Sequence, residues 1–200
     1  NEQQSQTLGE VVDSAKQLLN LINDVLDMSK IEAGSLNLFI EDNVNVRNIL
    51  DNLLSTGKIL LVEKSVELQA EIPDDLPTIR GDRQRILQIL LNIVANACKF
   101  TETGTINVSA VHSGDEIVFC IRDTGPGIAP EDQADVFQAF KQTTSGLRQG
   151  GGTGLGMPIS KSLAEAHGGR LWLESELHKG SSFYVALPIK SALLAPSISA

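Results

Sequence analysis

The sequence is poor in cysteine and in positive charge, and it lacks long apolar runs. Two cysteines among 200 residues cannot build a secreted disulfide scaffold or a zinc cluster, so Cys98 and Cys120 are expected to be buried, reduced thiols of a cytoplasmic protein. Sixteen Lys and Arg against 25 Asp and Glu give a net charge of −9, which argues against a nucleic-acid partner. No apolar run approaches the roughly 18 residues that span a bilayer.

What remains is the composition of a packed protein. Apolar residues make up 42% and charged residues 20% of the 200 residues, which is enough for one good-sized domain and a short appendage. The chain begins at Asn1 rather than Met, and we expect it to be a fragment of a longer protein.

Residues 1–35 are expected to form one long helix from a helical bundle. Apolar or small residues recur there at alternating steps of three and four, the spacing of a heptad seam, and a second stripe runs beside it. A face this wide predicts partners on two sides, as in a four-helix bundle; packing on the rest of the same chain is the alternative. Ala33-Gly34 predicts the end of the helix. The seam consists of Leu8, Val12, Ala15, Leu19, Ile22, Leu26 and Ser29.

Residues 36–190 are expected to form an α+β domain, a layered sandwich with helices over a mostly antiparallel sheet. Residues 130–153 are polar and long for a plain connection, which suggests a mobile lid. Residues 191–200 are expected to be a tail. The pattern predicts helices near 44–62, 82–99 and 155–167, and strands near 36–40, 66–70, 105–112, 116–123, 170–175 and 182–187.

The predicted helix at 82–99 has a polar face unlike an ordinary solvated one. Asn92, Asn96 and Lys99 recur at three- and four-residue spacing and share that face, although asparagine is a mediocre helix former. An amide oxygen suits a hard cation such as Mg²⁺, and an ammonium group suits phosphate. The row therefore suggests side chains that bind a metal ion and phosphate. The alternative is that the two asparagines are ordinary surface residues.

Two glycine-rich segments follow. Asp123-Thr124-Gly125-Pro126-Gly127 comes directly after an apolar strand, where a carboxylate could accept a hydrogen bond from an amino group; it could equally be a turn. Residues 150–156 hold five glycines before a helix N-terminus, which suits phosphate but also fits a flexible hinge. In this order, the polar row and the two segments together predict a nucleotide site.

These motifs resemble the catalytic, ATP-binding region of sensor histidine kinases, within the superfamily of gyrase, chaperone, histidine kinase and mismatch-repair ATPases. Residues 92–101 match the N box, 123–127 the first G box, 137–140 the F box and 152–156 the second G box. Residues 18–34 resemble the second helix of the family's dimerisation and phosphotransfer domain. The resemblance implies a two-layer α/β sandwich of the Bergerat type, preceded by a long bundle helix.

The resemblance also implies ATP and Mg²⁺ as cofactors and assigns roles to residues. Asn96 would bind Mg²⁺, with Asn92 on the metal or phosphate side; Lys99 would contact phosphate and Phe100 would line the base. Asp123 would recognise the adenine amino group, and Gly125 and Gly127 would make room for the ring. The residues expected around the phosphates are Arg148, Gly152, Thr153, Gly154, Leu155 and Gly156, while Ser182 would support the aspartate through water.

The family's phosphoacceptor histidine, in its H box, is missing from this sequence. His112, His167 and His178 do not stand on a helix before an acidic residue and a proline, so we expect them to be structural and the acceptor to lie upstream of residue 1. The implied partners are ATP or ADP, the protein's own phosphotransfer domain, a response regulator and, in the full-length protein, a second copy. A nucleotide-binding pseudokinase or scaffold is one alternative. An ATP hydrolase is another, disfavoured because Asn92 replaces the glutamate that activates water in the hydrolases.

Overall fold

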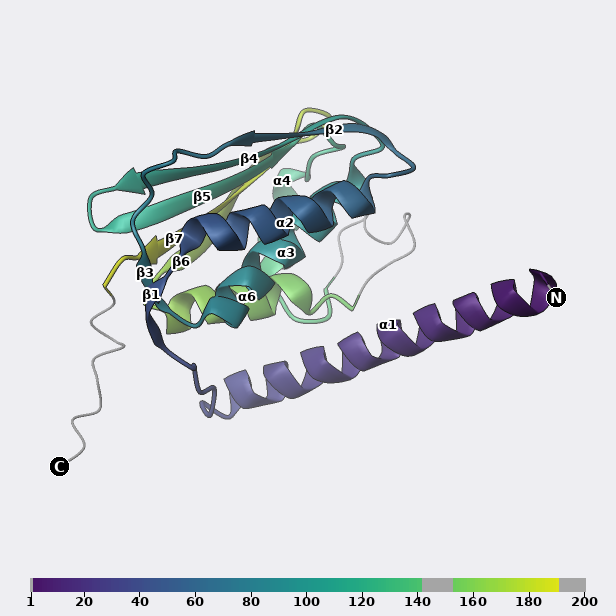
Figure 1. The fold of residues 1–200 in the computed structure, drawn as a ribbon, viewed down its shortest axis with the longest axis horizontal. Helices are drawn as coiled ribbons and strands as arrows, with labels where there is room; N and C mark the ends of the chain where they lie inside the picture. Colours follow the sequence, from purple (N-terminus) through teal and green to yellow (C-terminus); the bar gives the residue numbers. More distant parts are fainter. Residues whose placement is uncertain (1, 142–152, 191–200) are drawn as a thin grey trace. The chain divides into compact units, whose positions relative to one another are not determined.

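The computed structural model describes residues 2–141 and 153–190, which form two compact units, Asn1–Leu36 and Asn37–Ala200 (Figure 1). The first unit is helix α1 (Glu2–Glu32). The described elements of the second unit are β1 (Glu41–Val44), α2 (Val46–Leu60), β2 (Ser65–Glu71), β3 (Ile79–Gly81), α3 (Arg83–Phe100), β4 (Thr103–Ser113), β5 (Glu116–Asp123), α4 (Pro130–Gln133), the short 3₁₀ helix η1 (Asp135–Phe137), α6 (Gly156–Ala166), β6 (Arg170–Glu176) and β7 (Gly180–Pro188).

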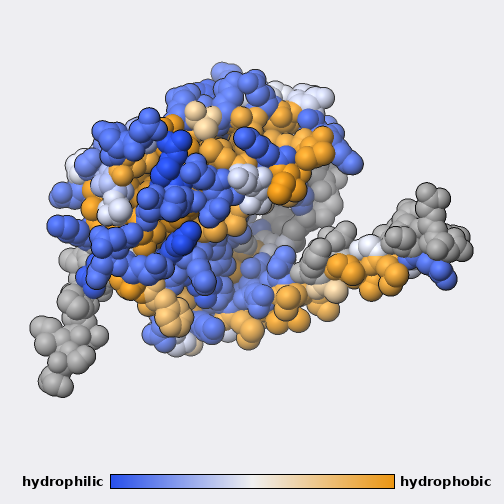
Figure 2. Space-filling model, in the orientation of Figure 1, coloured by the Kyte–Doolittle hydropathy of each residue, from blue (hydrophilic) through white to orange (hydrophobic). Residues whose placement is uncertain are grey.

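Helix α1 ends in a glycine turn and leaves its apolar side chains exposed. Gly34 adopts a φ of 63°, and Ser35 N donates a hydrogen bond to Lys30 O at 2.9 Å, which closes the last turn where the sequence predicted it. In the described part of the chain no helix is both long enough and apolar enough to cross a bilayer. The exposed seam residues, visible as an apolar stripe in Figure 2, include Leu8, Val12, Leu19, Ile22 and Leu26.

The second unit is built on a five-stranded sheet with the order β2-β4-β5-β7-β6. Strands β2 and β4 are parallel, and the other neighbouring pairs are antiparallel. The hairpin between β4 and β5 turns at Gly114, whose φ is 60°. All five strands were predicted from alternating apolar residues, with ends within two residues of those observed.

The strand predicted at 36–40 is wrong. Residues 35–40 have no regular structure, and the strand that follows, β1, pairs with the short and unpredicted β3 through Glu41–Gly81 and Val44–Ile79. The backbone N–H of Phe39 donates to Asp82 Oδ2 at 2.9 Å instead of to a neighbouring strand. Leu36, Leu38 and Ile40 are half-buried and Phe39 is exposed, so the alternation marks a covered side of the segment without a paired strand.

Helices α2, α3 and α6 cover one face of the sheet, with α3 packed against both α2 and α6 (Figure 1). The alternate residues of β4 and β5 that point toward the helices are fully buried, as are the apolar positions of α3. This two-layer arrangement confirms the predicted α+β fold class. The core facing α3 contains Ile106, Val108, Ala110, Ile117, Phe119 and Ile121.

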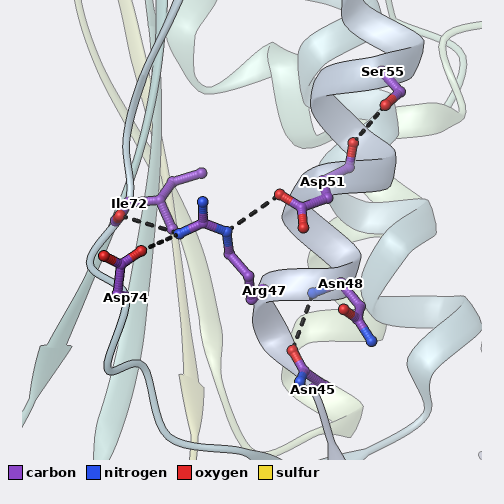
Figure 3. A network of polar contacts seen from close by, with 7 residues as sticks. All are labelled: Asn45, Arg47, Asn48, Asp51, Ser55, Ile72 and Asp74. Carbon is purple, nitrogen blue, oxygen red and sulfur yellow. Dashed lines mark hydrogen bonds and ion pairs between the residues drawn. The ribbon is translucent and has the colours of Figure 1, made fainter.

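Polar contacts fix the start of α2, as Figure 3 shows. The side chain of Asn45 accepts a hydrogen bond from Asn48 N at 3.1 Å, so the helix begins two residues later than the apolar pattern predicted. Arg47 then joins two segments, since its guanidinium contacts Asp51 one turn along at 3.2 Å and Asp74 at 3.1 Å. This exposed network ties α2 to the turn after β2.

Candidate functional site

Helix α3 carries the predicted polar row on a half-buried face. Its apolar side, including Ile86 and Leu90, is closed against the sheet and the other helices. Asn92, Asn96 and Lys99 lie on the other side, and each is only partly exposed. A face that is polar and still half-buried is more confined than a solvated helix surface, which favours a binding role for the row.

The amide of Asn92 joins α3 to the first turn of α6. Its Nδ2 donates hydrogen bonds to Gly156 O at 3.2 Å and to Ser160 Oγ at 3.0 Å. Ser160 is fully buried, so this contact is shielded from water. Because both bonds use the nitrogen, the orientation of the amide is fixed and the oxygen, Oδ1, is the atom left for a ligand.

Asn96 has the chemistry that a magnesium ligand needs. It lies one turn beyond Asn92, half-buried, and its amide makes no hydrogen bond within the part of the chain that the structure describes. Among the described residues, no three His, Cys, Asp or Glu side chains cluster into a metal site. Mg²⁺ is commonly held by one or two protein oxygens together with phosphate oxygens, so one amide oxygen fits this ion.

A lysine from outside the motifs holds the end of α3. Lys64 Nζ donates to the carbonyl oxygens of Cys98 at 2.6 Å, Lys99 at 3.0 Å and Thr101 at 3.2 Å. These carbonyls belong to the last turn, where intrahelical partners run out, and a positive charge there is favoured by the helix dipole. In the same last turn of α3, the Lys99 ammonium lies 5.4 Å from the centre of the Phe100 ring.

Asp123 ends strand β5 as a buried carboxylate. It is only 6% exposed, and its Oδ1 accepts a hydrogen bond from Gly125 N at 2.9 Å. Burial raises the pKa of the Asp123 carboxyl, while the backbone amides of Gly125 and Ser181 oppose the shift by hydrogen-bonding to the charged form. An acidic group that is buried, and that has no ion-pair partner among the described residues, is a candidate for ligand recognition.

The glycines after Asp123 are required by the chain itself. Gly127 has a φ of 68°, and a Cβ placed there would collide with Glu176 O at the end of β6. A Cβ on Gly125 would meet Asp123 Oδ1 at 2.9 Å and Thr101 Oγ1 at 3.2 Å. Both positions are thus crowded by protein atoms, so a side chain at either would force its neighbours to shift; that the two glycines make room for a ring stays a prediction.

The sheet register separates Ser182 from Asp123. Asp123 pairs with Ser181, while Ser182 pairs with Arg122 on the opposite face of the sheet. Ser181 is buried, its backbone N–H faces the Asp123 carboxylate, and its hydroxyl lies 3.0 Å from Ser175 Oγ. The residue positioned to support the aspartate is therefore Ser181, one place before the serine that we had expected.

Within the predicted lid, Phe140 contacts the backbone of Gly154, which directly follows the lid. Phe140 N donates to Gly154 O at 3.1 Å, and the φ of Gly154, 69°, suits a glycine turned against that backbone. Thr153 Oγ1 accepts from Leu155 N at 3.1 Å, and the Leu155 side chain is buried as an anchor. Arg148 and Gly152, also expected near the phosphates, lie outside the described residues. The end of the F box therefore contacts the second G box.

The buried His167 makes the contacts expected of a structural histidine. His167 is 2% exposed; its Nε2 accepts from Asp82 N at 3.0 Å, and its Nδ1 lies 2.7 Å from Leu163 O. That pair of contacts requires a neutral ring with the proton on Nδ1. Burial lowers the pKa of His167. His112 and His178 lie at strand and turn positions.

Sequence reasoning missed Lys64, Thr101, Ser160 and Ser181. A weak signal existed for Ser160, because it is a lone hydroxyl on the apolar side of a predicted helix, four residues after Gly156. Thr101 belongs to the quoted N-box match, but the motif alone assigned it no role. Nothing in the local sequence marks Lys64, because its three acceptors lie more than thirty residues away.

Comparison with known families gives two matches. Residues 81–191 match the family described as "Histidine kinase-, DNA gyrase B-, and HSP90-like ATPase". Residues 1–34 match the "His Kinase A (phospho-acceptor) domain". The first match contains every element that carries the candidate site from α3 onward, and the second covers α1.

Among curated proteins, the chain is 40% identical over 191 residues to the circadian input-output histidine kinase CikA of Synechococcus elongatus, covering 94% of this chain and 25% of that protein. It is 38% identical over 191 residues to the sensor protein TorS of Escherichia coli, covering 94% of this chain and 21% of TorS. The chain thus spans about a quarter or less of the length of these relatives.

Among solved structures, full-length ShkA in complex with AMPPNP matches with a TM-score of 0.82 and 34% identity, over 95% of this chain and 40% of that chain. The histidine kinase AdeS of Acinetobacter baumannii matches with a TM-score of 0.75 at 22% identity, over 91% of this chain and 83% of that chain, which supports the fold.

Proposed function

Because this chain belongs to the family of histidine kinase-, DNA gyrase B- and HSP90-like ATPases, we propose that it is the ATP-binding catalytic core of a sensor histidine kinase. It transfers the γ-phosphoryl group of Mg-ATP to a histidine of its phosphotransfer domain, of which α1 is one part. The observation that carries the proposal is the meeting of two segments at Gly125, which lies between the Asp123 carboxylate and the end of α3.

The base and the phosphates are bound by different elements. At the end of β5, Asp123 accepts a hydrogen bond from the adenine amino group, and Phe100 lines the ring. On α3, Asn96 and Asn92 lie about one and two turns before Phe100 and present amide oxygens. Lys99, directly before Phe100, supplies positive charge. Phosphoryl transfer depends mainly on positioning and charge stabilisation, which these residues provide without a covalent step. Bound Mg²⁺ supplies further positive charge at the phosphate oxygens, with Asn96 as its protein ligand.

The second G box binds the phosphates. Thr153, Gly154, Leu155 and Gly156 precede the N-terminus of α6, where backbone N–H groups lack intrahelical partners and favour anions. We include Arg148 and Gly152 in the same role. The hydrogen bond from Asn92 Nδ2 to Gly156 O keeps this segment beside α3.

Asn92 favours phosphotransfer over hydrolysis. Hydrolysis needs a base that takes a proton from water, and a neutral amide has no useful basicity. The Asn92 nitrogen is also committed to Gly156 and Ser160, which holds the side chain in place as a ligand rather than as a proton acceptor. The γ-phosphoryl group is thereby kept for a histidine.

The wider assignments follow from the family. The His Kinase A match over α1 supports a phosphotransfer domain in the same protein, a homodimer built through it, and a response regulator as the next acceptor. We assign the protein to the cytoplasm, where ATP is available and where the free thiols of Cys98 and Cys120 stay reduced.

Nucleotide binding by Asp123→Asn tests the assignment. A hydrogen bond to a charged group contributes about 1.5–3 kcal/mol, so the affinity for Mg-ATP measured by titration calorimetry should fall by about ten- to a hundredfold. Asp115→Asn is the matched control, because Asp115 lies in the hairpin at the other end of β5 and should leave the affinity unchanged. Equal affinities for both variants would remove Asp123 from the site.

A transfer assay separates the kinase from its alternatives. The unaltered chain, mixed with a separate helix that carries the family's H box and with γ-labelled ATP, should place acid-labile phosphate on that helix. Nucleotide binding without transfer would favour the pseudokinase. Steady release of inorganic phosphate without labelled protein would favour the hydrolase, and label on His112, His167 or His178 would place the acceptor within this chain.

A further inference from the structure

The hydroxyl of Thr101 is a buried polar group without a partner. Thr101 caps the C-terminus of α3, where its N–H donates to Ala97 O at 3.0 Å and its carbonyl accepts from Lys64 at 3.2 Å. The residue is 0% exposed, yet Oγ1 makes no hydrogen bond to any described residue. Buried hydroxyls are nearly always paired, so this exception calls for a missing partner.

The same hydroxyl borders the place where a base is expected. A Cβ built on Gly125 would lie 3.2 Å from Thr101 Oγ1 and 2.9 Å from Asp123 Oδ1. The hydroxyl at the end of α3 and the carboxylate at the end of β5 therefore flank one glycine. The N–H and the carbonyl of Thr101 already have partners, so Oγ1 is the one polar atom of this residue without a described partner.

We propose that Thr101 is a base-binding residue, whose hydroxyl donates a hydrogen bond, directly or through one ordered water, to the ring nitrogen beside the 6-amino group of a purine nucleotide. The assignment rests on the proposed function, which places the purine at Asp123. A carboxylate can only accept, so it suits the amino group and does not suit the neighbouring nitrogen lone pair. The hydroxyl supplies the donor that this nitrogen needs. Selection against 6-oxopurines comes from the carboxylate, which cannot donate to their oxygen, because a hydroxyl can also accept from their protonated ring nitrogen.

Thr101→Val tests the assignment, because valine keeps the shape and removes the hydroxyl. Without nucleotide, the melting temperature should rise by about 2–4 °C, since a buried unpaired polar group is gone. The affinity for Mg-ATP should fall by about two- to tenfold, the contribution of one neutral hydrogen bond. Thr101→Ser, which keeps the hydroxyl, should hold the affinity within about twofold while the melting temperature falls.

Two nucleotide analogues divide the roles of the two residues. Purine riboside triphosphate lacks the amino group but keeps the ring nitrogen, so Thr101→Val should weaken its binding as much as that of ATP, whereas Asp123→Asn should weaken ATP alone. 1-Deazaadenosine triphosphate keeps the amino group but lacks that ring nitrogen, so Thr101→Val should weaken its binding less than that of ATP.

The outcomes distinguish this assignment from the proposed function. If the unaltered chain binds ATP and Thr101→Val binds it equally well, Thr101 is not a base-binding residue. The same holds if Thr101→Val lowers the melting temperature and weakens every nucleotide equally, as a structural role predicts. If the unaltered chain binds no adenine nucleotide, the proposed function fails and this assignment fails with it.

Discussion

Helices α1 and α3 show the same apolar spacing but differ in what covers it. Both carry apolar residues at steps of three and four, and both are long. In α3 these residues are buried within the second unit, where Leu90 is 0% exposed. In α1 they remain exposed, as for Leu19, which is 58% exposed. The periodicity predicts that a helix has an apolar face, and it does not predict which chain covers that face.

The difference also separates two kinds of function. Because α3 is covered on its apolar side within its own unit, its other side can hold a fixed row of Asn92, Asn96 and Lys99 for binding. Helix α1 instead offers its apolar stripe as an interaction surface, which agrees with the match of residues 1–34 to a His Kinase A domain. In the proposed function, α3 positions ligands and α1 packs against other helices.

The largest difference between the two helices should appear in the free energy of unfolding after matched alanine substitutions. Leu90→Ala leaves a cavity in the core and should lower the free energy of unfolding by about 2–5 kcal/mol. Leu19→Ala should change it by less than about 0.5 kcal/mol, because an exposed side chain loses little burial. Urea unfolding followed by the fluorescence of Trp172, the single tryptophan, measures both variants.

A large loss from Leu19→Ala would reverse the comparison. It would mean that the seam of α1 is covered by the remainder of its own chain, the alternative that the sequence left open. Leu90→Ala serves as the internal reference, since its cost depends only on the packing of the second unit.

Sequence reasoning predicted the elements better than their contacts. Alternation and helical spacing depend on neighbours in the sequence, which is why α3, β4 and β5 were predicted within two residues. The strand expected at 36–40 failed because its backbone bonds to Asp82, far along the chain. A single place in register decided between Ser181 and Ser182, because neighbouring strand residues face opposite sides of a sheet.

The candidate site shows the same division. The motifs identified Asn92 and Asp123, whose residue types suggest their chemistry, but not the residues that hold them. The bond from Asn92 to Ser160 spans 68 positions, and the crowding of Gly127 comes from Glu176. Such supports follow from tertiary packing, which one sequence does not reveal.

The contacts at the helix ends also differ, and the pH dependence of the free energy of unfolding should reveal the difference. Helix α1 ends in a local turn, whereas α3 begins at buried Asp82, whose N–H donates to His167. Because the pKa of His167 is lowered in the folded state, the unfolded chain binds a proton more readily as the pH falls below about 6.5. The free energy of unfolding should then fall by up to about 1.4 kcal/mol per pH unit, until the pH reaches the folded pKa.

Urea unfolding at pH 7.5 and pH 5.5 measures this loss. His167→Gln cannot gain a proton, so its loss between the two pH values should be smaller than that of the unaltered protein. His112→Gln, at an exposed strand position, should retain the full loss. If His167→Gln shows the same pH dependence as the unaltered protein, the buried imidazole is not its source.

Substitutions that affect the polar faces of the two helices should differ least, and the difference should appear in the affinity for Mg-ATP. Asn92 on α3 is held by Ser160, whereas Asn23 on α1 is exposed. Ser160→Ala removes one neutral hydrogen bond that fixes the Asn92 amide, so the affinity for Mg-ATP should fall by about two- to tenfold, while Asn23→Ala should leave it unchanged.

A double-mutant cycle decides whether Ser160 acts through Asn92 or only through packing. If it positions the amide, Ser160→Ala should have no further effect on nucleotide affinity once Asn92 is alanine, because the group that it orients is gone. If the two losses simply add, Ser160 supports α6 independently of the amide. In that case the Asn92 amide would be oriented by its other hydrogen bond, to Gly156 O, and not by Ser160.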